Sequence, residues 1–348
     1  MKVLLYKGDY KDLAKSGIGT AILHQEKILK EIGIPYTTDE SDDYDIVHIN
    51  GVYPKSLSFA KKCKKRGKKV IYYAHSTEED FRDTFKFSNI LSKVYKKWLI
   101  HCYKTGDVII TPTEYSKSLI ENYGIKKKIF PISNGIELSI YDRKKANGMA
   151  FRKKYNYAKD DKVIMSVGLF FERKGLLDFL ELARIFPNYK FIWFGHLDFK
   201  YIPKKISSAI INKPDNVLFP GFVKSDELRD AYVGSDIFVF LTREETEGIV
   251  LLEALALKTP TIINDIPIYE YLEDGKNIYK SKNVLECKDK IENILNGKLK
   301  NVTNKGYEVV KEVDLSNIGK RLKEVYKYVL DEKTEVFDNE QNRIKKYK

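Results

Sequence analysis

Short apolar runs alternate with segments of helical periodicity along most of the chain, and this order limits the possible fold more than any other feature. Such near-continuous apolar runs are typical of parallel strands that are covered on both faces. In the first half the runs are 3–6, 46–49, 70–73, 108–110 and 129–132. Helical patterns lie near 18–32, 55–66, 77–104 and 114–123. This alternation predicts an α/β fold with a doubly wound parallel sheet.

The pattern then starts again. Residues 141–160 are polar and contain no strand pattern, and a second series of strands and helices follows from residue 163. A length of 348 residues also favours two domains. We therefore predict two Rossmann-like domains, at 1–150 and 151–314, with a hinge near 134–160. A helix at 315–330 could cross back to the first domain, and a polar tail at 331–348 is expected to be frayed.

Composition excludes several classes of protein. The chain is 43% hydrophobic and 32% charged, which is ordinary for a globular protein and not for a disordered one. No apolar run approaches the roughly 18–20 residues of a membrane-spanning helix, and the start of the chain is too short in apolar residues for a signal peptide. The cysteines, Cys63, Cys102 and Cys287, are far apart in the sequence. We expect a reducing cytoplasm and no metal site.

The net charge of +13 is local rather than spread along the chain. Residues 1–160 contain 31 basic and 19 acidic residues, whereas residues 161–348 contain 31 and 30. Within the first half, residues 55–104 contain 14 basic and 4 acidic residues. A codon bias toward lysine would spread the charge evenly, so this segment suggests an anionic partner such as a nucleic acid, a membrane surface or a phosphorylated substrate.

Candidate functional residues follow the predicted strands, where open α/β sheets bind their ligands. Gly17 and Gly19 lie after the first strand and could let backbone N–H groups approach a phosphate, although a plain turn has the same pattern. His75 follows another strand and could donate into a cleft, but a lone histidine is more often structural. Arg173 and Lys174 lie together before a helix, where a bound diphosphate would offset their charge and a solvated pair is the alternative.

The segment 243–254 carries the strongest signal. Gly248 is placed to begin a helix, which leaves the N–H groups of Ile249 and Val250 without helical acceptors. Glu253 lies inside this otherwise apolar helix, where a carboxylate is costly unless it is paired or bound to a ligand. It could accept hydrogen bonds from two vicinal hydroxyls, or it could be half-exposed with no ligand.

Glu245 to Glu253 resembles the Glu-x7-Glu signature of retaining glycosyltransferases of family four, which have the GT-B fold of two Rossmann-like domains facing across a cleft. Further segments occur in the order of that family. They are Ser16-Gly17-Ile18-Gly19, Ala74-His75, Ser133-Asn134-Gly135-Ile136, Arg173-Lys174-Gly175 and Gly221-Phe222-Val223. The resemblance covers residues 1 to about 330 and implies sugar transfer from a nucleotide-diphosphate donor with retention of configuration.

The resemblance also implies roles for individual residues. Glu253 would hold the ribose hydroxyls, and Arg173 and Lys174 would neutralise the diphosphate leaving group. Glu245 and His75 would contact the reacting sugar. The other implied donor contacts are Gly17, Gly19, Phe222, Val223, Gly248, Ile249 and Val250. The sequence departs from the family at Leu169, Thr246 and Glu137, which stand where arginine, proline and aspartate are common.

Further segments resemble the bacterial glycosyl-diacylglycerol synthases, which build diglycosyl-diacylglycerol. They are 1–6, 15–19, 45–50, 75–81 and 111–118. This resemblance implies transfer of a second hexose, from UDP-glucose or UDP-galactose, to monoglucosyl-diacylglycerol, with no cofactor. It implies a peripheral enzyme on the cytoplasmic face of the cell membrane.

Anionic membrane lipids are then the expected partner of the basic segment. The residues expected at the membrane are Lys61, Lys62, Lys64, Lys65, Arg66, Lys93, Lys96, Lys97 and Ile100. On a helix, Leu91, Val94, Tyr95, Trp98 and Cys102 share the opposite face, which we expect to pack on the sheet.

Three alternatives remain open from the sequence. The acceptor could be a capsular or other cell-surface glycan. The chain could be a non-catalytic sugar-binding relative, although Arg173, Lys174, Glu245 and Glu253 oppose this. The charge alone would suit a nucleic-acid-binding protein, but the basic cluster is almost entirely lysine and matches no known binding module, so we expect no nucleic-acid partner.

Overall fold

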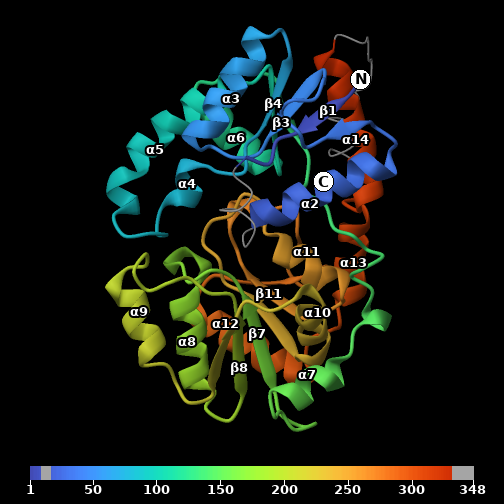
Figure 1. Ribbon diagram of the computed structural model, residues 1–348. Helices are drawn as coiled ribbons and strands as arrows, with labels where there is room; N and C mark the ends of the chain where they lie inside the picture. The colour runs from blue at the N-terminus through green and yellow to red at the C-terminus, as the bar shows by residue number, and fades with distance from the viewer. Residues whose placement is uncertain (9–16, 331–348) are drawn as a thin grey trace. The chain divides into compact units, whose positions relative to one another are not determined.

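A computed structural model describes residues 1–8 and 17–330. Their contacts divide into two compact units, each built around a six-stranded parallel sheet (Figure 1). The first unit contains the described residues of Met1–Thr77, Lys96–Gly135 and Leu315–Lys348. The second contains Glu78–Tyr95 and Ile136–Asp314. The sheets and helices confirm the α/β fold class that the sequence predicts. Ser16 and the tail at 331–348 lie outside the described residues.

The sheet of the first unit has the order β2-β1-β3-β4-β5-β6, with every neighbouring pair parallel. Its strands are β1 (Val3–Leu5), β2 (Tyr36–Thr37), β3 (Ile46–Ile49), β4 (Lys69–Tyr73), β5 (Val108–Thr111) and β6 (Ile129–Pro131). Its helices are α2 (Gly17–Glu31), α3 (Pro54–Lys65), α6 (Glu114–Asn122) and α14 (Leu315–Val329). β3 and β5 are buried along their whole length, and their residues are apolar apart from His48 and Thr111.

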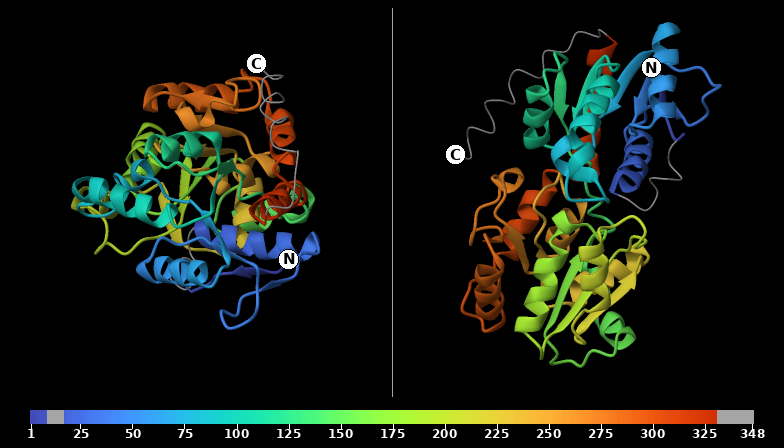
Figure 2. Two further views of the ribbon diagram at one scale, coloured as in Figure 1. Left: turned by 90° about the horizontal axis from the view of Figure 1, so that it is seen from above. Right: turned by 90° about the vertical axis from the view of Figure 1, so that its left-hand side faces the viewer.

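The sheet of the second unit has the order β12-β11-β10-β7-β8-β9 and is also parallel. Its strands are β7 (Val163–Val167), β8 (Lys190–Phe194), β9 (Val217–Gly221), β10 (Ile237–Phe240), β11 (Thr261–Asn264) and β12 (Tyr279–Ser281). Its helices are α4 (Glu78–Phe81), α7 (Gly148–Lys154), α8 (Leu176–Ile185), α9 (Lys204–Ile211), α10 (Ser225–Gly234), α11 (Ile249–Ala256), α12 (Val284–Leu295) and α13 (Thr303–Lys311). Figure 2 shows the helices outside the strands from two further directions.

The stretch 77–104, which the sequence pattern treats as one helical segment, contains two helices. α4 ends at Phe81, and α5 runs from Ser88 to Tyr103. Between them, Asp83 and Phe87 adopt positive φ angles of 52° and 66°, which an α-helix does not accommodate. Residues 88–95 of α5 group with the second unit, and its later residues group with the first.

Residues 136–150 and helix α14 determine where the two units begin and end. Residues 136–150 group with the second unit, where Ile136 pairs with Asp314 and α7 packs against α10. Helix α14 packs against α2 in the first unit. There Tyr326 bonds His48 over 3.0 Å, and a Cβ on Gly319 would lie 2.6 Å from Ile32. The first unit is therefore built from both ends of the chain.

Candidate functional site

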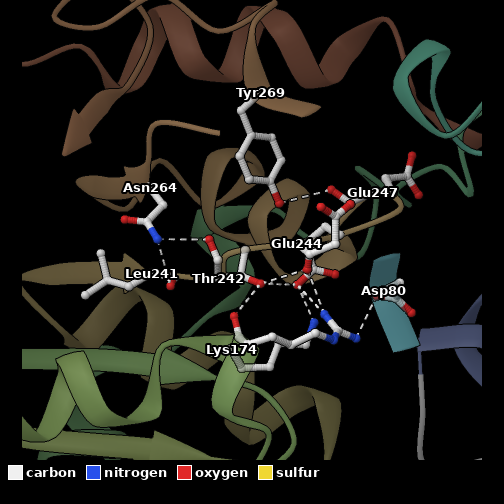
Figure 3. A network of polar contacts seen from close by, with 10 residues as sticks. Asp80, Lys174, Leu241, Thr242, Glu244, Glu247, Asn264 and Tyr269 are labelled. Atoms are coloured by element: carbon white, nitrogen blue, oxygen red, sulfur yellow. Dashed lines mark hydrogen bonds and ion pairs between the residues drawn. The ribbon is translucent and has the colours of Figure 1, made fainter. Parts of the chain in front are cut away.

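Three charged side chains gather in the second unit, on the segments that follow β7 and β10. Lys174 (Figure 3) and Arg173 lie on the single 3₁₀ turn Glu172–Lys174, and Glu245 lies on the loop after β10. The Lys174 ammonium contacts Glu245 Oε1 directly, and an Arg173 Nη1 lies 3.7 Å from the same oxygen. The parallel sheet thus brings together residues that are about 70 positions apart in sequence, as the sequence analysis expects from their places after strands.

Arg173 is only 7% exposed and is held from several directions. Its Nη1 donates to the Glu244 carbonyl and its Nη2 pairs with Asp80, both over 2.7 Å. Its backbone N–H donates to the Asp83 carbonyl over 3.2 Å. Among the residues that the structure describes, its Nε finds no acceptor. The guanidinium is fixed but keeps one buried donor for a further partner.

Burial and ion pairing shift the pKa values of this cluster in opposite directions. Burial alone would raise the pKa of Glu245, but the ion pairs with Lys174 and then Arg173 outweigh it and lower the pKa. Burial lowers the pKa of Lys174, and Glu245 acts against that shift. Burial raises the pKa of Asp80, with Arg173 opposing. The two cations and two carboxylates therefore balance one another without a ligand, and an incoming diphosphate would compete for the cations.

The surrounding backbone fixes this arrangement closely. Gly175 has φ of 77°, and a Cβ at this position would lie 2.3 Å from the Leu241 carbonyl oxygen. The Asn264 amide donates to the carbonyls of Leu241 and Thr242 over 3.1 Å each, and the Thr242 hydroxyl donates to Glu245 over 2.9 Å (Figure 3). These contacts hold the turn after β7 and the loop after β10 in a fixed relative position.

Gly248 is the N-cap of α11, as the sequence predicts, and its φ of 88° is one that glycine tolerates best. A Cβ there would lie 2.6 Å from the hydroxyl of Tyr269, which itself donates to the Glu247 carbonyl over 3.3 Å. The first-turn N–H groups of Ile249 and Val250 have no acceptor within the helix. Backbone donors are therefore presented at the end of the loop that carries Glu245.

Glu253 is buried in α11, so the alternative of a half-exposed Glu253 is wrong. The Tyr141 hydroxyl donates to Oε1 over 2.5 Å, and the Tyr232 hydroxyl lies 3.1 Å from Oε2. Burial raises the pKa of Glu253 to about 7, although both hydrogen bonds act to lower it. A carboxyl in this state changes its charge within the physiological range.

Phe222 and Val223 follow β9 in the same unit. Phe222 is 46% exposed and Val223 is partly exposed. Both are accessible for contact with a flat aromatic ligand.

His75, Gly17 and Gly19 belong to the first unit. His75 is buried, stacks on Tyr73 at 4.2 Å between ring centroids, and contacts the side chain of Asn50 over 2.8 Å. Burial lowers its pKa to about 3, so its ring is neutral. Gly17 begins α2 and Gly19 is buried in its first turn.

The basic residues expected at a membrane differ in how accessible they are. Those exposed are Lys61, Lys62, Lys64, Lys65, Arg66, Lys93 and Lys97. Lys64 is paired with Asp107 over 2.7 Å, and Lys96 is half-buried with its ammonium over the Tyr123 ring. The free part of the basic surface is therefore smaller than the sequence count suggests.

The expected division of α5 into a buried apolar face and an outer basic face is wrong in part. Leu91 and Val94 are 49% and 64% exposed, and Ile100 is half-buried rather than outward. The buried side chains of this helix are Ser88, Ser92, Leu99, Cys102 and Tyr103. Cys102 is buried and Lys93 and Lys97 are exposed, as expected. The prediction is wrong in the first half of the helix, where Leu91 and Val94 are exposed and serines are buried.

Four residues of the site escaped the sequence analysis. Asp80 and Thr242 contact the charged cluster, and Tyr141 and Tyr232 contact Glu253. The partners of Asp80, Tyr141 and Tyr232 are distant in sequence, so no local spacing reveals them, and Thr242 lies three positions before Glu245 without a distinguishing pattern. Within residues 1–8 and 17–330 no group of three metal-ligating side chains occurs, and no helix there is both long and apolar enough to cross a bilayer.

Two protein families match the chain. Glycosyl transferases group 1 matches residues 149–309, and Glycosyltransferase Family 4 matches residues 27–140. The processive diacylglycerol alpha-glucosyltransferase of Acholeplasma laidlawii is 42% identical over 95% of this chain and 99% of the relative. The alpha-galactosylglucosyldiacylglycerol synthase of Streptococcus pneumoniae is 24% identical over 66% of this chain and 63% of its own length.

Solved structures agree on the fold. Anabaena Alr3699/HepE in complex with UDP and glucose superposes with a TM-score of 0.74, at 14% identity, over 94% of this chain and 99% of its own. The same protein in complex with UDP-glucose also gives a TM-score of 0.74. At this identity the likeness concerns the fold alone.

Proposed function

We propose that this chain, which belongs to the GT-B glycosyltransferases of group 1 and family four, transfers glucose or galactose from a UDP-sugar to a glycosylated diacylglycerol with retention of configuration. The acceptor class follows from the 42% identical relative, which is named a diacylglycerol glucosyltransferase, and from two more distant glycosyl-diacylglycerol synthases. The observation that carries the donor assignment is the buried Arg173–Lys174–Glu245 cluster.

In this proposal the leaving UDP departs with its charge facing Lys174 and Arg173, which their contacts already hold in position. Glu245 orients Lys174 and also contacts the donor hexose. The N–H groups of Ile249 and Val250 and the backbone of Gly248 donate to the donor, and Glu253 accepts from its ribose hydroxyls.

The remaining donor and sugar contacts are proposed on the resemblance alone. Phe222 and Val223 flank the base, Gly17 and Gly19 lie near the phosphates or the acceptor, and His75 faces the reacting sugar. The neutral ring of His75 suits it to hydrogen bonding with the sugar rather than to carrying charge.

The decisive assay supplies the purified protein with UDP-glucose or UDP-galactose and monoglucosyl-diacylglycerol in mixed micelles. We expect a diglycosyl-diacylglycerol with the configuration of the donor retained, as read by linkage analysis of the product. Water-soluble oligosaccharides should not replace the lipid acceptor. Equal transfer to a soluble glycan would instead favour a capsular or other cell-surface glycan as the acceptor.

We also propose peripheral binding to the cytoplasmic leaflet through α3 and α5. The exposed cations Lys61, Lys62, Lys65 and Arg66 lie at the end of α3, and each contributes about 1 kcal/mol near an anionic surface. Exposed apolar side chains accompany Lys93 on and before α5. They are Phe85, Phe87, Ile90, Leu91 and Val94.

Replacing Lys61, Lys62, Lys65 and Arg66 with glutamine should weaken binding to phosphatidylglycerol vesicles by about 10²-fold or more, because four contributions of about 1 kcal/mol are lost. Vesicle sedimentation measures the change. Glutamine at Lys282, Lys298, Lys300 and Lys305, four exposed lysines of the second unit, is the matched control. Equal losses in both variants would show that only net charge matters and not this surface.

A further inference from the structure

Two tyrosine hydroxyls lie against the buried carboxyl group of Glu253. Glu253 is 6% exposed in a helix whose other residues are apolar, and each of its oxygens meets one tyrosine hydroxyl. In the described part of the chain it has no cationic partner. Burial and the charge of Glu253 raise the pKa of Tyr141, and Arg229 acts against this shift. Burial is the largest influence on the pKa of Glu253, and the two tyrosine hydrogen bonds act against it.

The hydroxyl groups of Tyr141 and Tyr232 differ in the number of hydrogen-bond partners within their reach. The Tyr232 oxygen lies 3.0 Å from the Val250 carbonyl as well as 3.1 Å from Glu253. A hydroxyl has one proton, so Tyr232 can donate to Val250 and accept from a protonated Glu253. Tyr232 consequently accommodates both forms of the carboxyl.

Tyr141 favours the ionised form. Among the described residues, Glu253 is the sole hydrogen-bond partner of its hydroxyl. A protonated Glu253 can donate from Oε2 to Tyr232 while Oε1 still accepts from Tyr141, but a hydrogen bond to an ionised carboxylate is roughly twice as strong as one between neutral groups. Tyr141 therefore stabilises the ionised carboxylate more than the protonated carboxyl.

We infer that Tyr141 is a positioning residue for nucleotide binding, which keeps Glu253 ionised and oriented so that it accepts both hydroxyls of a ribose diol. This rests on the proposed function, which assigns the ribose to Glu253. Each carboxylate oxygen has about two acceptor positions. One on each is used by a tyrosine, and one on each is left for a hydroxyl.

The test is Tyr141→Phe, with UDP binding measured by calorimetry between pH 6 and pH 9. Loss of the hydrogen bond raises the pKa of Glu253, so at pH 7 the variant should bind UDP at least tenfold more weakly than the wild type. The ratio should fall to threefold or less at pH 9, where Glu253 ionises without help. Turnover at saturating donor should change less than threefold, and the loss should be smaller with 2′-deoxy-UDP.

Tyr155→Phe is the matched control, because Tyr155 donates to another carboxylate, Glu227, in the same unit. Its UDP affinity should equal that of the wild type at every pH. If the wild type binds no UDP at any pH, the proposed function fails. If it binds UDP but the Tyr141→Phe ratio is the same at all pH values, Tyr141 only packs and the inference is overturned.

Discussion

Lys174→Met should lower the turnover number by about 10²- to 10³-fold, the range found when one fixed electrostatic group is removed from a site of charge development. Methionine fills most of the volume of the lysine side chain but has no charge. Lys174 is buried against Glu245, so solvent does not replace the missing ammonium. The measurement is steady-state transfer from the UDP-sugar to the glycolipid, with donor KM and turnover determined separately.

A loss of folding would imitate this result, because the variant leaves Glu245 buried with fewer partners. The double variant Lys174→Met with Glu245→Gln also removes the charge of Glu245 and should recover stability. Its turnover should remain low. If Lys174→Met alone keeps turnover within fivefold of the wild type, Lys174 does not neutralise the leaving group.

Glu253→Gln should stabilise the protein by about 3 kcal/mol at pH 8 and have little effect at or below pH 4. The pKa of Glu253 is raised from 4.5 to about 7 in the folded protein, so folding favours the protonated form. Stability from this group is full below the unfolded pKa and is lost as the pH rises toward 7. The difference between the two pKa values corresponds to about 3 kcal/mol.

Urea unfolding of both proteins at pH 4 and pH 8 measures this effect. The glutamine oxygen can accept from Tyr141 and its amide can donate to Tyr232, so the buried hydrogen bonds persist. The same variant should lose UDP affinity at pH 8, because an amide accepts a diol less well than a carboxylate does. Equal stability of the two proteins at pH 8 would show that Glu253 is not a buried charge.

The sequence predicted the two parallel sheets well because their strands are unmistakable. Ile237–Phe240 is apolar without interruption, Ile46–Ile49 is apolar except for His48, and both are fully buried strands. The interruption between α4 and α5 could not be seen in the same way. It contains neither glycine nor proline, and positive φ at Asp83 and Phe87 is fixed by the packed structure rather than by residue type.

The charged cluster could also be anticipated, because Arg173, Lys174 and Glu245 each follow a strand and parallel strands end at a common edge. Tyr141 and Tyr232 could not. Tyrosine at those positions has no distinguishing local pattern, and Tyr141 reaches Glu253 from 112 positions away. Only folding brings the second set of donors to the carboxylate.

Helix α14 has a consequence for how the chain matures on the ribosome. The strands of the first sheet are synthesised first, but the helix that covers α2 and bonds His48 is synthesised last among the described elements. Its buried residues are Leu315, Ile318, Gly319, Leu322, Val325, Tyr326 and Val329. A nascent chain that has emerged only through β6 therefore leaves the apolar surface beneath α14 uncovered. The unit that is translated first is completed after the one that is translated second.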